Sequence, residues 1–390
     1  MLLTGCMPNR ILAGAPTTGS AAVGTSSATT SGTAATGTAG TTESTASGGV
    51  GAPVRYASVT NFGDSITCGY YATPGNGEGN VYSQAGYAGV LDAKLGLPAT
   101  NLCRAGDMAA DMTRNWVYPK TDSALGQSQL YTMLIGVNDV NYCGGEVPCV
   151  YGWSEAVAAS LAWLALPATD KVLGSAMTAS VGAWTADLAL GHGSGEATTK
   201  QGASLSFTVT QAVAGRSLHL AYRVFAPWLV TQGTAVVAVD GVAVTTLSSL
   251  PGDGLWIDTF NHTTDTIFLA SVPLGAVGEH TVTVTTTSAD GGFFSLLWAG
   301  VSSGNYATVA GAPRVLIGSV ATTTSAVLNT AVDNYNAALG PMVAALVAEG
   351  MNITVAPTAH VLDIQTDYVD EFHPNNGGHV KVAETFAGVL

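Results

Sequence analysis

The stretch NFGDSITCGYY, residues 61–71, contains the turn on which the fold of the N-terminal part of the chain depends. It overlaps YASVTNF at 56–62, which predicts a short apolar strand ending at Gly63. Asp64 and Ser65 come directly after that strand. Both residue types commonly cap helices or complete turns, because their side chains accept hydrogen bonds from unpaired backbone N–H groups. A Ser in this place is also a candidate nucleophile.

Strands and helices alternate downstream of this turn. We expect a helix over 82–95, strands over 99–103 and 129–135, and a helix over 153–166. Such alternation is typical of a parallel sheet that is covered by helices on both faces.

The pattern changes between residues 169 and 313, where β-prone runs follow one another. These runs are SLSFTVTQ, RSLHLAYRVF, TAVVAVDGVAVTT, DTIFLASV, HTVTVTTT and FFSLLWAG. The Asp240-Gly241 pair is typical of a type I′ hairpin turn. The segment therefore predicts an antiparallel β-sandwich of jelly-roll type.

Strand and helix patterns return at Arg314. RVLIGSV and NITVAP predict strands, residues 324–348 a long helix bent at Gly340-Pro341, and the end of the chain a terminal helix. We therefore predict one α/β domain, residues 54–168 and 314–390, which the sandwich at 169–313 interrupts. The interruption lies between a helix and a strand, at the amino-terminal edge of the sheet.

Polar residues follow the predicted strands at the opposite edge, where parallel sheets bind ligands. Ser65, Gly106 and Asn138 each follow a strand, and the late loop DYVDEFHPNN carries Asp370 three residues before His373. We expect Ser65 to be a nucleophile, His373 its general base and Asp370 the group that orients the imidazole. The backbone N–H groups of Ser65 and Gly106 and the Asn138 amide would form the oxyanion hole.

Four motifs in this order resemble those of the SGNH hydrolases, also called GDSL esterases and lipases. They are GDSIT, NLCRAG, GVND and DEFHPN, and the resemblance covers residues 56–166 and 314–390. It implies a flavodoxin-like three-layer α/β/α fold, no cofactor, and hydrolysis of carboxylic esters through an acyl-enzyme on Ser65. Ser65 does not lie in a Gly-x-Ser-x-Gly motif of the α/β-hydrolase kind.

Structural roles compete with these assignments. Ser65 can be a helix cap and Asn138 a turn residue. His379 competes with His373, but it follows two glycines and has no acid three residues before it. The aromatic residues of the insert predict either a sugar-stacking platform or the sandwich core; they are Tyr222, Phe225, Trp228, Trp256 and Trp298.

Composition limits the partners. The formal net charge of −14 repels phosphate backbones, so we expect no nucleic-acid binding. No apolar run reaches the length of a spanning helix. Neither a Cys-x-x-Cys nor a His-Glu-x-x-His motif is present, so the sequence predicts no metal site.

The N-terminal segment suggests export. Within residues 1–12, Leu3-Thr4-Gly5-Cys6 resembles the lipobox of bacterial lipoproteins, although the basic and apolar regions that usually precede a lipobox are missing. This indicates a start placed too far downstream or an accidental match, and we expect a lipid anchor at Cys6. Residues 13–53 are almost wholly Ala, Gly, Ser and Thr and predict a flexible tether.

The other four cysteines are an even number, as in an oxidising compartment. Cys143 and Cys149 bracket a short loop that a disulfide closes easily, which leaves Cys68 to pair with Cys103. Four unpaired thiols are the alternative.

These observations predict an exported serine esterase, in the cell envelope or secreted, that removes acetyl or other short acyl groups, plausibly from a polysaccharide. An acyltransferase with the same chemistry and a non-catalytic glycan-binding surface lipoprotein are the alternatives.

Overall fold

A computed structural model describes residues 56–72, 82–121, 130–181, 184–187, 195–225, 230–250 and 265–390. The predicted lipobox, Cys6 and the tether lie outside the described residues, and so do Trp228 and Trp256. The described residues all belong to one compact unit. Among them, no helix is both long and apolar enough to cross a membrane.

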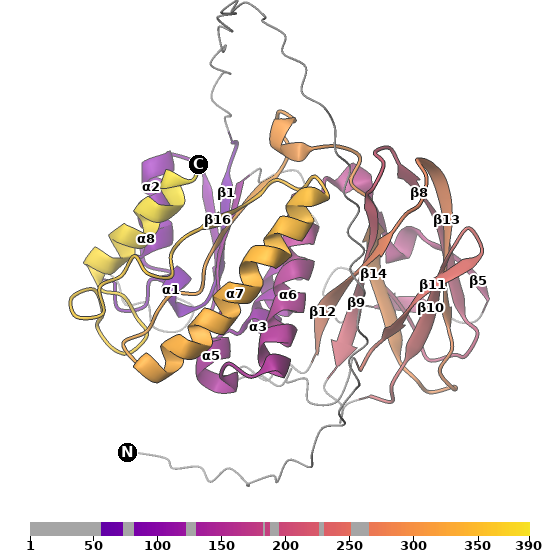
Figure 1. Cartoon of the computed structure of the whole chain (residues 1–390), viewed down its shortest axis with the longest axis horizontal. Coiled ribbons are helices and arrows are strands. Elements are labelled where there is room, and N and C mark those ends of the chain that lie inside the picture. Colours follow the sequence, from indigo (N-terminus) through magenta and orange to yellow (C-terminus); the bar gives the residue numbers. More distant parts are fainter. Residues whose placement is uncertain are drawn as a thin grey trace, which may run out of the picture. The chain divides into compact units, whose positions relative to one another are not determined.

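One sheet is entirely parallel, with its strands in the order β16-β15-β3-β1-β2. Figure 1 labels its strands β1 and β16. Its strands are β1 (Val59–Gly63), β2 (Ala99–Cys103), β3 (Leu130–Leu134), β15 (Arg314–Gly318) and β16 (Ile353–Ala356). Alternate residues of β15 face opposite ways: Val315 and Ile317 pack with helices α6 and α7, whereas Leu316 packs with α2 and α8. Helices therefore bury this sheet on both faces.

The helices begin and end close to the predicted places, with two exceptions. The predicted helix at 82–95 begins at Tyr87, and the one predicted at 153–166 begins at Val147, where Pro148 occupies its first turn. Helix α7 runs on through Pro341. The helical elements are α1 (Ser65–Cys68), α2 (Tyr87–Leu95), α3 (Ala109–Met112), a π-helical turn (Thr113–Val117), α4 (Tyr118–Thr121), α5 (Val137–Cys143), α6 (Val147–Ala165), α7 (Ala326–Ala348) and α8 (Asn376–Gly388).

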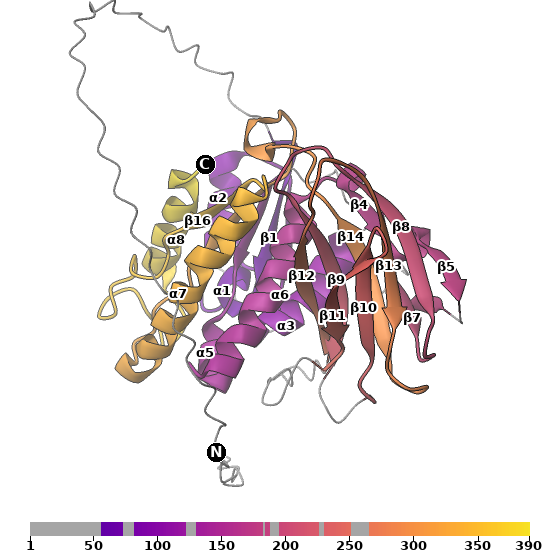
Figure 2. The same cartoon turned by 45° about the vertical axis from the view of Figure 1, so that its right-hand side comes forward.

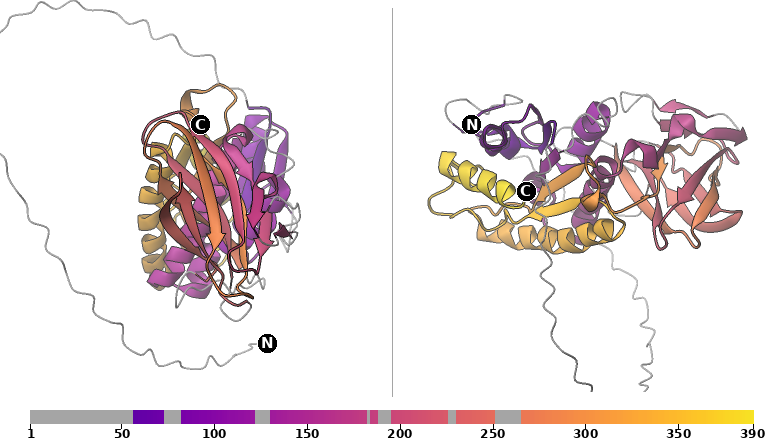
Figure 3. Two further views of the ribbon diagram at one scale, coloured as in Figure 1. Left: turned by 90° about the vertical axis from the view of Figure 1, so that its right-hand side faces the viewer. Right: turned by 90° about the horizontal axis from the view of Figure 1, so that it is seen from above.

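Two antiparallel sheets follow in the chain and pack face to face (Figures 2 and 3). The first has the order β11-β10-β13-β8-β5, with β5 (Thr178–Val181), β8 (Ser204–Gln211), β10 (Thr234–Val239), β11 (Val242–Ser248) and β13 (Gly278–Thr286). The second has the order β12-β9-β14-β7-β6 and includes β4, which pairs with β14. Its strands are β4 (Lys171–Leu173), β6 (Thr185–Asp187), β7 (Gly195–Thr198), β9 (Ser217–Phe225), β12 (Asp265–Pro273) and β14 (Phe294–Gly300).

The second antiparallel sheet is also buried on both faces. In β14, Leu296 points into the core between the two antiparallel sheets, whereas Leu297 and Trp298 join the core that contains α6. The Trp298 indole N–H donates to the Tyr118 hydroxyl at 2.9 Å, and the Trp298 ring lies 5.8 Å from the ring of Trp163 on α6. Helix α6 is therefore covered by a parallel sheet on one side and an antiparallel sheet on the other.

The fold class predicted from the sequence, a flavodoxin-like α/β/α domain with an inserted sandwich, is therefore wrong. The antiparallel sheets contain five and six strands against five in the parallel sheet, so the described strands are mostly antiparallel. The layers do not end at the helices, because one hydrophobic core continues from the parallel sheet through α6 into the second antiparallel sheet. Hydrophobic periodicity reports which residues are buried, but not which layer covers them.

A buried ion-pair network joins the antiparallel sheets to the remainder of the chain. Arg223 on β9 donates to Asp187 at 2.7 Å and to Asp265 at 2.7 Å, with side chains 7%, 4% and 12% exposed. Arg114, from the π-helical turn after α3, also donates to Asp265, at 2.9 Å. Asp265 therefore accepts from two arginines that come from different parts of the fold.

Replacing Asp265 by Ala should lower the free energy of unfolding by roughly 3 kcal/mol, because two arginines then lose a shared carboxylate in a buried place. Urea unfolding measures this change. The matched control is Asp290→Ala, which removes a carboxylate from the exposed pair with Lys200 and should shift the urea midpoint far less. Equal midpoints for Asp265→Ala and the wild type would contradict the assigned role.

Candidate functional site

The turn after β1 is built by a glycine and a capping carboxylate. Gly63 has φ +158°, and a Cβ atom there would collide with the Thr67 side chain and the Leu134 carbonyl oxygen. Asp64 is the N-cap of α1, since its Oδ1 accepts from the Ile66 backbone N–H at 2.9 Å. The cap is thus Asp64 and not Ser65, which is the first residue of α1.

The structure brings Ser65, His373 and Asp370 together. His373 Nε2 lies 2.9 Å from Ser65 Oγ, and His373 Nδ1 lies 2.8 Å and 2.9 Å from the two carboxylate oxygens of Asp370. One ring nitrogen of His373 thus contacts the Ser65 hydroxyl, and the other contacts the Asp370 carboxylate. This is the geometry in which a histidine accepts a proton from a serine while a carboxylate fixes its tautomer.

Hydrogen bonds to backbone N–H groups within the loop fix the conformation of the loop that carries His373. Asp370 Oδ1 accepts from the backbone N–H groups of Phe372 and His373, each at 2.8 Å, and Val369 N–H donates to the His373 carbonyl at 2.9 Å. Partial burial raises the pKa of Asp370, but hydrogen bonds from Phe372, the His373 ring and the His373 backbone outweigh it and lower the pKa. Asp370 is therefore a carboxylate at neutral pH.

Access to this cluster is from the side of the imidazole. The residue Ser65 is only 4% exposed, whereas the side chains of His373 and Asp370 are 16% and 39% exposed. Two aromatic rings border the same opening, because the Tyr70 and Tyr71 ring centroids lie 4.7 Å and 5.5 Å from that of His373.

The predicted oxyanion donors lie at the ends of the neighbouring strands. Gly106, with φ +83°, is in a turn closed by a hydrogen bond from the Asp107 N–H to the Arg104 carbonyl. A disulfide from Cys68 to Cys103 ties α1 to the strand just before this turn. The Asn138 amide lies between them, where it donates to the Asp107 carbonyl at 2.9 Å and approaches Asp64 Oδ2 at 3.4 Å.

Both disulfides predicted from the cysteine spacing are present. Cys68 pairs with Cys103, and Cys143 pairs with Cys149. The first of them fixes the distance between α1, which carries Ser65, and the end of β2.

Buried carboxyl groups lie behind the strand ends. Burial raises the pKa of Asp64 to about 7 and that of Asp107 to about 6, with further increases from Asp107 and Asp111 respectively. Asp139 is also raised well above its ordinary pKa by burial, although both of its oxygens accept from the Ala109 N–H. These groups place less negative charge beside Ser65 at neutral pH than the sequence alone implies.

His379 has a structural place. It is buried in α8, where its Nδ1 accepts from the Tyr87 backbone N–H at 3.2 Å, and burial lowers its pKa to about 4. It is therefore a neutral imidazole that connects α8 to α2, and it does not contact Ser65.

Two aromatic residues that border the imidazole were not among the predicted site residues. Tyr70 and Tyr71 directly follow the GDSITCG stretch, and their closeness to Ser65 in the chain was the available signal. Their contact with His373 depends on a loop about 300 residues later and has no local sequence signature.

The predicted sugar platform of the antiparallel sheets does not form among the described residues. Tyr222, Phe225 and Trp298 are at most 8% exposed and belong to the hydrophobic packing. In the part of the chain that the structure describes, no group of three or more His, Cys, Asp or Glu side chains is arranged to hold a metal ion.

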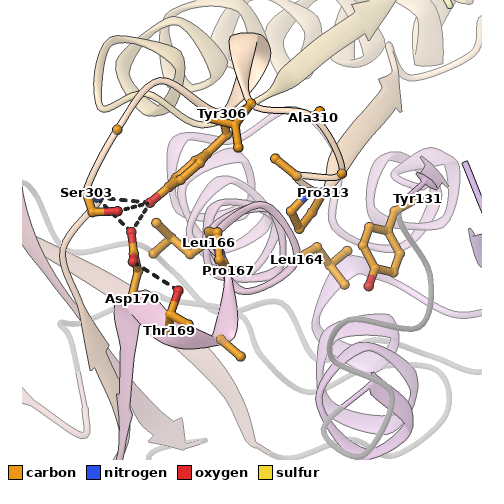
Figure 4. A pocket seen from close by; sticks show the side chains of 15 residues that line it. Tyr131, Leu164, Leu166, Pro167, Thr169, Asp170, Ser303, Tyr306, Ala310 and Pro313 are labelled. Atoms are coloured by element: carbon orange, nitrogen blue, oxygen red, sulfur yellow. Dashed lines mark hydrogen bonds between the residues drawn. The ribbon is translucent and has the colours of Figure 1, made fainter. Parts of the chain in front are cut away.

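A cavity of about 460 Å³ lies at the other end of the parallel sheet (Figure 4). Its lining includes Tyr131, Leu164 and the two segments by which the chain enters and leaves the antiparallel sheets. Asp170 links these segments, because it accepts from the Tyr306 hydroxyl and from the Ser303 N–H. No residue of the Ser65 cluster lines this cavity.

Comparisons with known proteins find neither a matching family model nor a matching curated protein. The matching solved structures include a family 36 carbohydrate-binding module in complex with calcium and xylotriose, at 16% identity and TM-score 0.25, covering 33% of this chain and 96% of that one. The module CsCBM6-3 from Clostridium stercorarium, in complex with cellobiose, matches at 14% identity and TM-score 0.24, covering 34% and 92%. A family 35 module from Cellvibrio japonicus matches at 24% identity and TM-score 0.20, covering 27% and 69%.

These findings contradict the family suggested by the four motifs. The matches are carbohydrate-binding modules with a β-sandwich fold, and none of the three is an SGNH hydrolase. The assignment to the SGNH or GDSL esterases is therefore wrong, since motifs of a few residues specify turns at strand ends and leave the remaining layers open. At these TM-scores the matches define neither a ligand nor an activity for this chain.

The buried carboxyl groups predict how stability depends on pH. Asp64 has an ordinary pKa near 4 when unfolded and about 7 when folded, so between these values the folded state keeps a proton that the unfolded state has lost. Stability should therefore fall as pH rises from about 4 to about 7. Asp64→Asn should flatten this decrease in urea unfolding measured across that range.

Asp290→Asn serves as the control for this pH dependence. Hydrogen bonds from Gln201 and Lys200 lower the pKa of this exposed carboxylate, so its contribution changes below pH 4 and the slope from 4 to 7 should stay as in the wild type. An unchanged slope in Asp64→Asn would show that Asp64 is not the group responsible.

Proposed function

We propose that this protein is a serine-dependent hydrolase of carboxylic esters, acting on acetyl or other short acyl groups. The observation that carries the proposal is the 2.9 Å contact between His373 Nε2 and Ser65 Oγ, with Asp370 on the other ring nitrogen. A serine hydroxyl is a weak nucleophile and reacts at neutral pH only when a neighbouring base takes its proton. The Ser65 hydroxyl and the Asp370 carboxylate both lie at hydrogen-bonding distance from the His373 ring.

In the first half of the proposed reaction, Ser65 Oγ attacks the ester carbonyl carbon while His373 Nε2 takes the hydroxyl proton. The negative charge that forms on the carbonyl oxygen is stabilised by N–H donors at the strand ends, for which Ser65, Gly106 and Asn138 are the candidates. The bond to the alcohol oxygen then breaks, His373 gives its proton to that oxygen, and an acyl-enzyme remains on Ser65.

In the second half, water takes the place of the alcohol. His373 accepts a proton from the water, the hydroxide attacks the acyl carbon, and the released Ser65 oxygen takes the proton back from His373. Asp370 keeps Nδ1 protonated and stabilises the imidazolium in both halves. A sugar hydroxyl in place of water makes the same site an acyltransferase, and the products formed with a glycan acceptor distinguish the two.

A polysaccharide is the proposed carrier of the acyl group. The matched carbohydrate-binding modules fit such a partner in general terms. A non-catalytic glycan-binding protein is the second candidate, and it differs from the first in making Ser65 dispensable.

Ser65→Ala should abolish labelling by a fluorophosphonate probe and lower the hydrolysis of p-nitrophenyl acetate by about 10³-fold or more, because the nucleophile is lost. Ser154→Ala is the matched control, since its hydroxyl donates to the Val150 carbonyl within α6, and it should behave as the wild type. Co-sedimentation with insoluble acetylated xylan measures glycan binding in the same variants.

The two candidates then give different results. If the wild-type protein neither reacts with the probe nor hydrolyses the ester, yet sediments with the polysaccharide, the glycan-binding candidate holds and the hydrolase proposal fails. Hydrolysis that survives in Ser65→Ala contradicts the assigned nucleophile.

Export to an oxidising compartment, with the protein secreted or held at the cell envelope, is part of the same proposal. The two disulfides support it, because such bonds are rare in reducing cytosol. Mass spectrometry of non-reduced protein from its native source should find Cys68–Cys103 and Cys143–Cys149 linked. Four free thiols in that sample would contradict export.

A further inference from the structure

Two tyrosine rings form a wall beside the catalytic imidazole. The Tyr70 and Tyr71 centroids are 4.5 Å apart with ring planes at 73°, and both rings contact His373. Tyr71 is 44% exposed, so a ring that contacts His373 is accessible to solvent.

The backbone holds Tyr71 in an unfavourable conformation. Its φ is +63°, and the only other described residue besides glycine with a positive φ is Asp240, in the hairpin turn before Gly241. Aromatic residues rarely adopt this conformation, because it strains the backbone. Folded proteins retain such strained residues mostly at functional sites. Tyr71 is the third residue of a turn that the Ala72 N–H closes on the Gly69 carbonyl, a place where a positive φ is usual but Gly or Asn is the normal residue.

The residues on either side of Tyr71 are firmly held. The Tyr70 N–H donates to the Ser65 carbonyl at 2.9 Å, and the Ala72 N–H donates to the Gly69 carbonyl at 3.0 Å. Ala72 is fully buried, and its carbonyl accepts from the Ser83 hydroxyl at 3.3 Å. An exposed ring between such anchors keeps a fixed position relative to Ser65 and His373.

The position of the two tyrosine rings indicates which half of a bound ester, the alcohol or the acyl group, they would contact. His373 gives its proton to the departing alcohol, so the alcohol must lie on the imidazole side of Ser65. The acyl carbonyl oxygen must point instead toward the candidate donors Gly106, in the turn after β2, and Asn138, in α5 after β3. The two tyrosines therefore border the alcohol and not the acyl group.

We propose that Tyr70 and Tyr71 form a subsite that stacks the sugar ring of an acylated glycan, with Tyr71 as its main contact. A sugar ring presents a face of C–H groups that packs on an aromatic face, and Tyr adds a hydroxyl for its polar edge. Asp370 and the net charge of −14 disfavour acidic sugars, so the ring is neutral. This inference rests on the proposed function and adds the class of alcohol that the site accepts.

Two esters with the same acyl group test the subsite. Tyr71→Asn removes the ring but retains a residue type that tolerates a positive φ, so the melting temperature should not fall. For this variant kcat/KM should drop about three- to tenfold on acetylated xylo- or manno-oligosaccharides and stay within about twofold of wild type on ethyl acetate. Tyr71→Phe, which keeps the aromatic face, should retain most of the activity on the sugar esters.

Each other result overturns the inference. Equal losses on both kinds of ester in Tyr71→Asn would show a structural role, and an undiminished kcat/KM on the sugar esters would show that the ring does not bind them. If the wild type hydrolyses ethyl acetate and reacts with the fluorophosphonate probe but leaves the sugar esters intact, the subsite fails while the hydrolase stands. If the wild type shows neither reaction, the proposed function itself fails and the subsite with it.

Discussion

The register of three parallel strands is the constraint on which the site depends. Gly63, the last residue of β1, pairs with Cys103 of β2 on one side and with Leu134 of β3 on the other. Three strands thus end at one level, and the residues that follow them share one edge of the sheet. Ser65, Gly106 and Asn138 lie there because their strands end together, and the Cys68–Cys103 disulfide fixes two of these ends to each other.

The other half of the site comes from far along the chain. The contact between Ser65 and His373 joins residues 308 positions apart, after the chain has built both antiparallel sheets and returned through β15 and β16. The second antiparallel sheet packs on α6, and α6 packs on the parallel sheet, so these parts share one core. A change in the Arg223–Asp265 network therefore acts on the same compact unit that positions His373.

Burial has a different effect on each carboxyl group near the nucleophile. Asp370 is partly exposed and accepts three hydrogen bonds from N–H groups, so it stays ionised and serves the imidazole. Asp64 is fully buried, and this burial outweighs its hydrogen bonds from backbone N–H groups and raises its pKa to about 7. Asp370 thus presents a carboxylate to His373, while the carboxyl groups behind Ser65 are partly protonated near neutral pH.

The sequence by itself determined the local features: the glycine turn after β1, the Asp240-Gly241 hairpin with both residues at positive φ, the short loop that the Cys143–Cys149 disulfide closes and the identity of the residues at the strand ends. Each depends on neighbours in the chain, where steric limits and side-chain capping act directly. Only the tertiary structure decided that α6 lies between two sheets, that Trp298 is core instead of a sugar platform, and that Tyr71 stands beside His373. Those outcomes depend on which surfaces meet across hundreds of residues, and a pattern of apolar residues records that a side chain is buried without recording its partner.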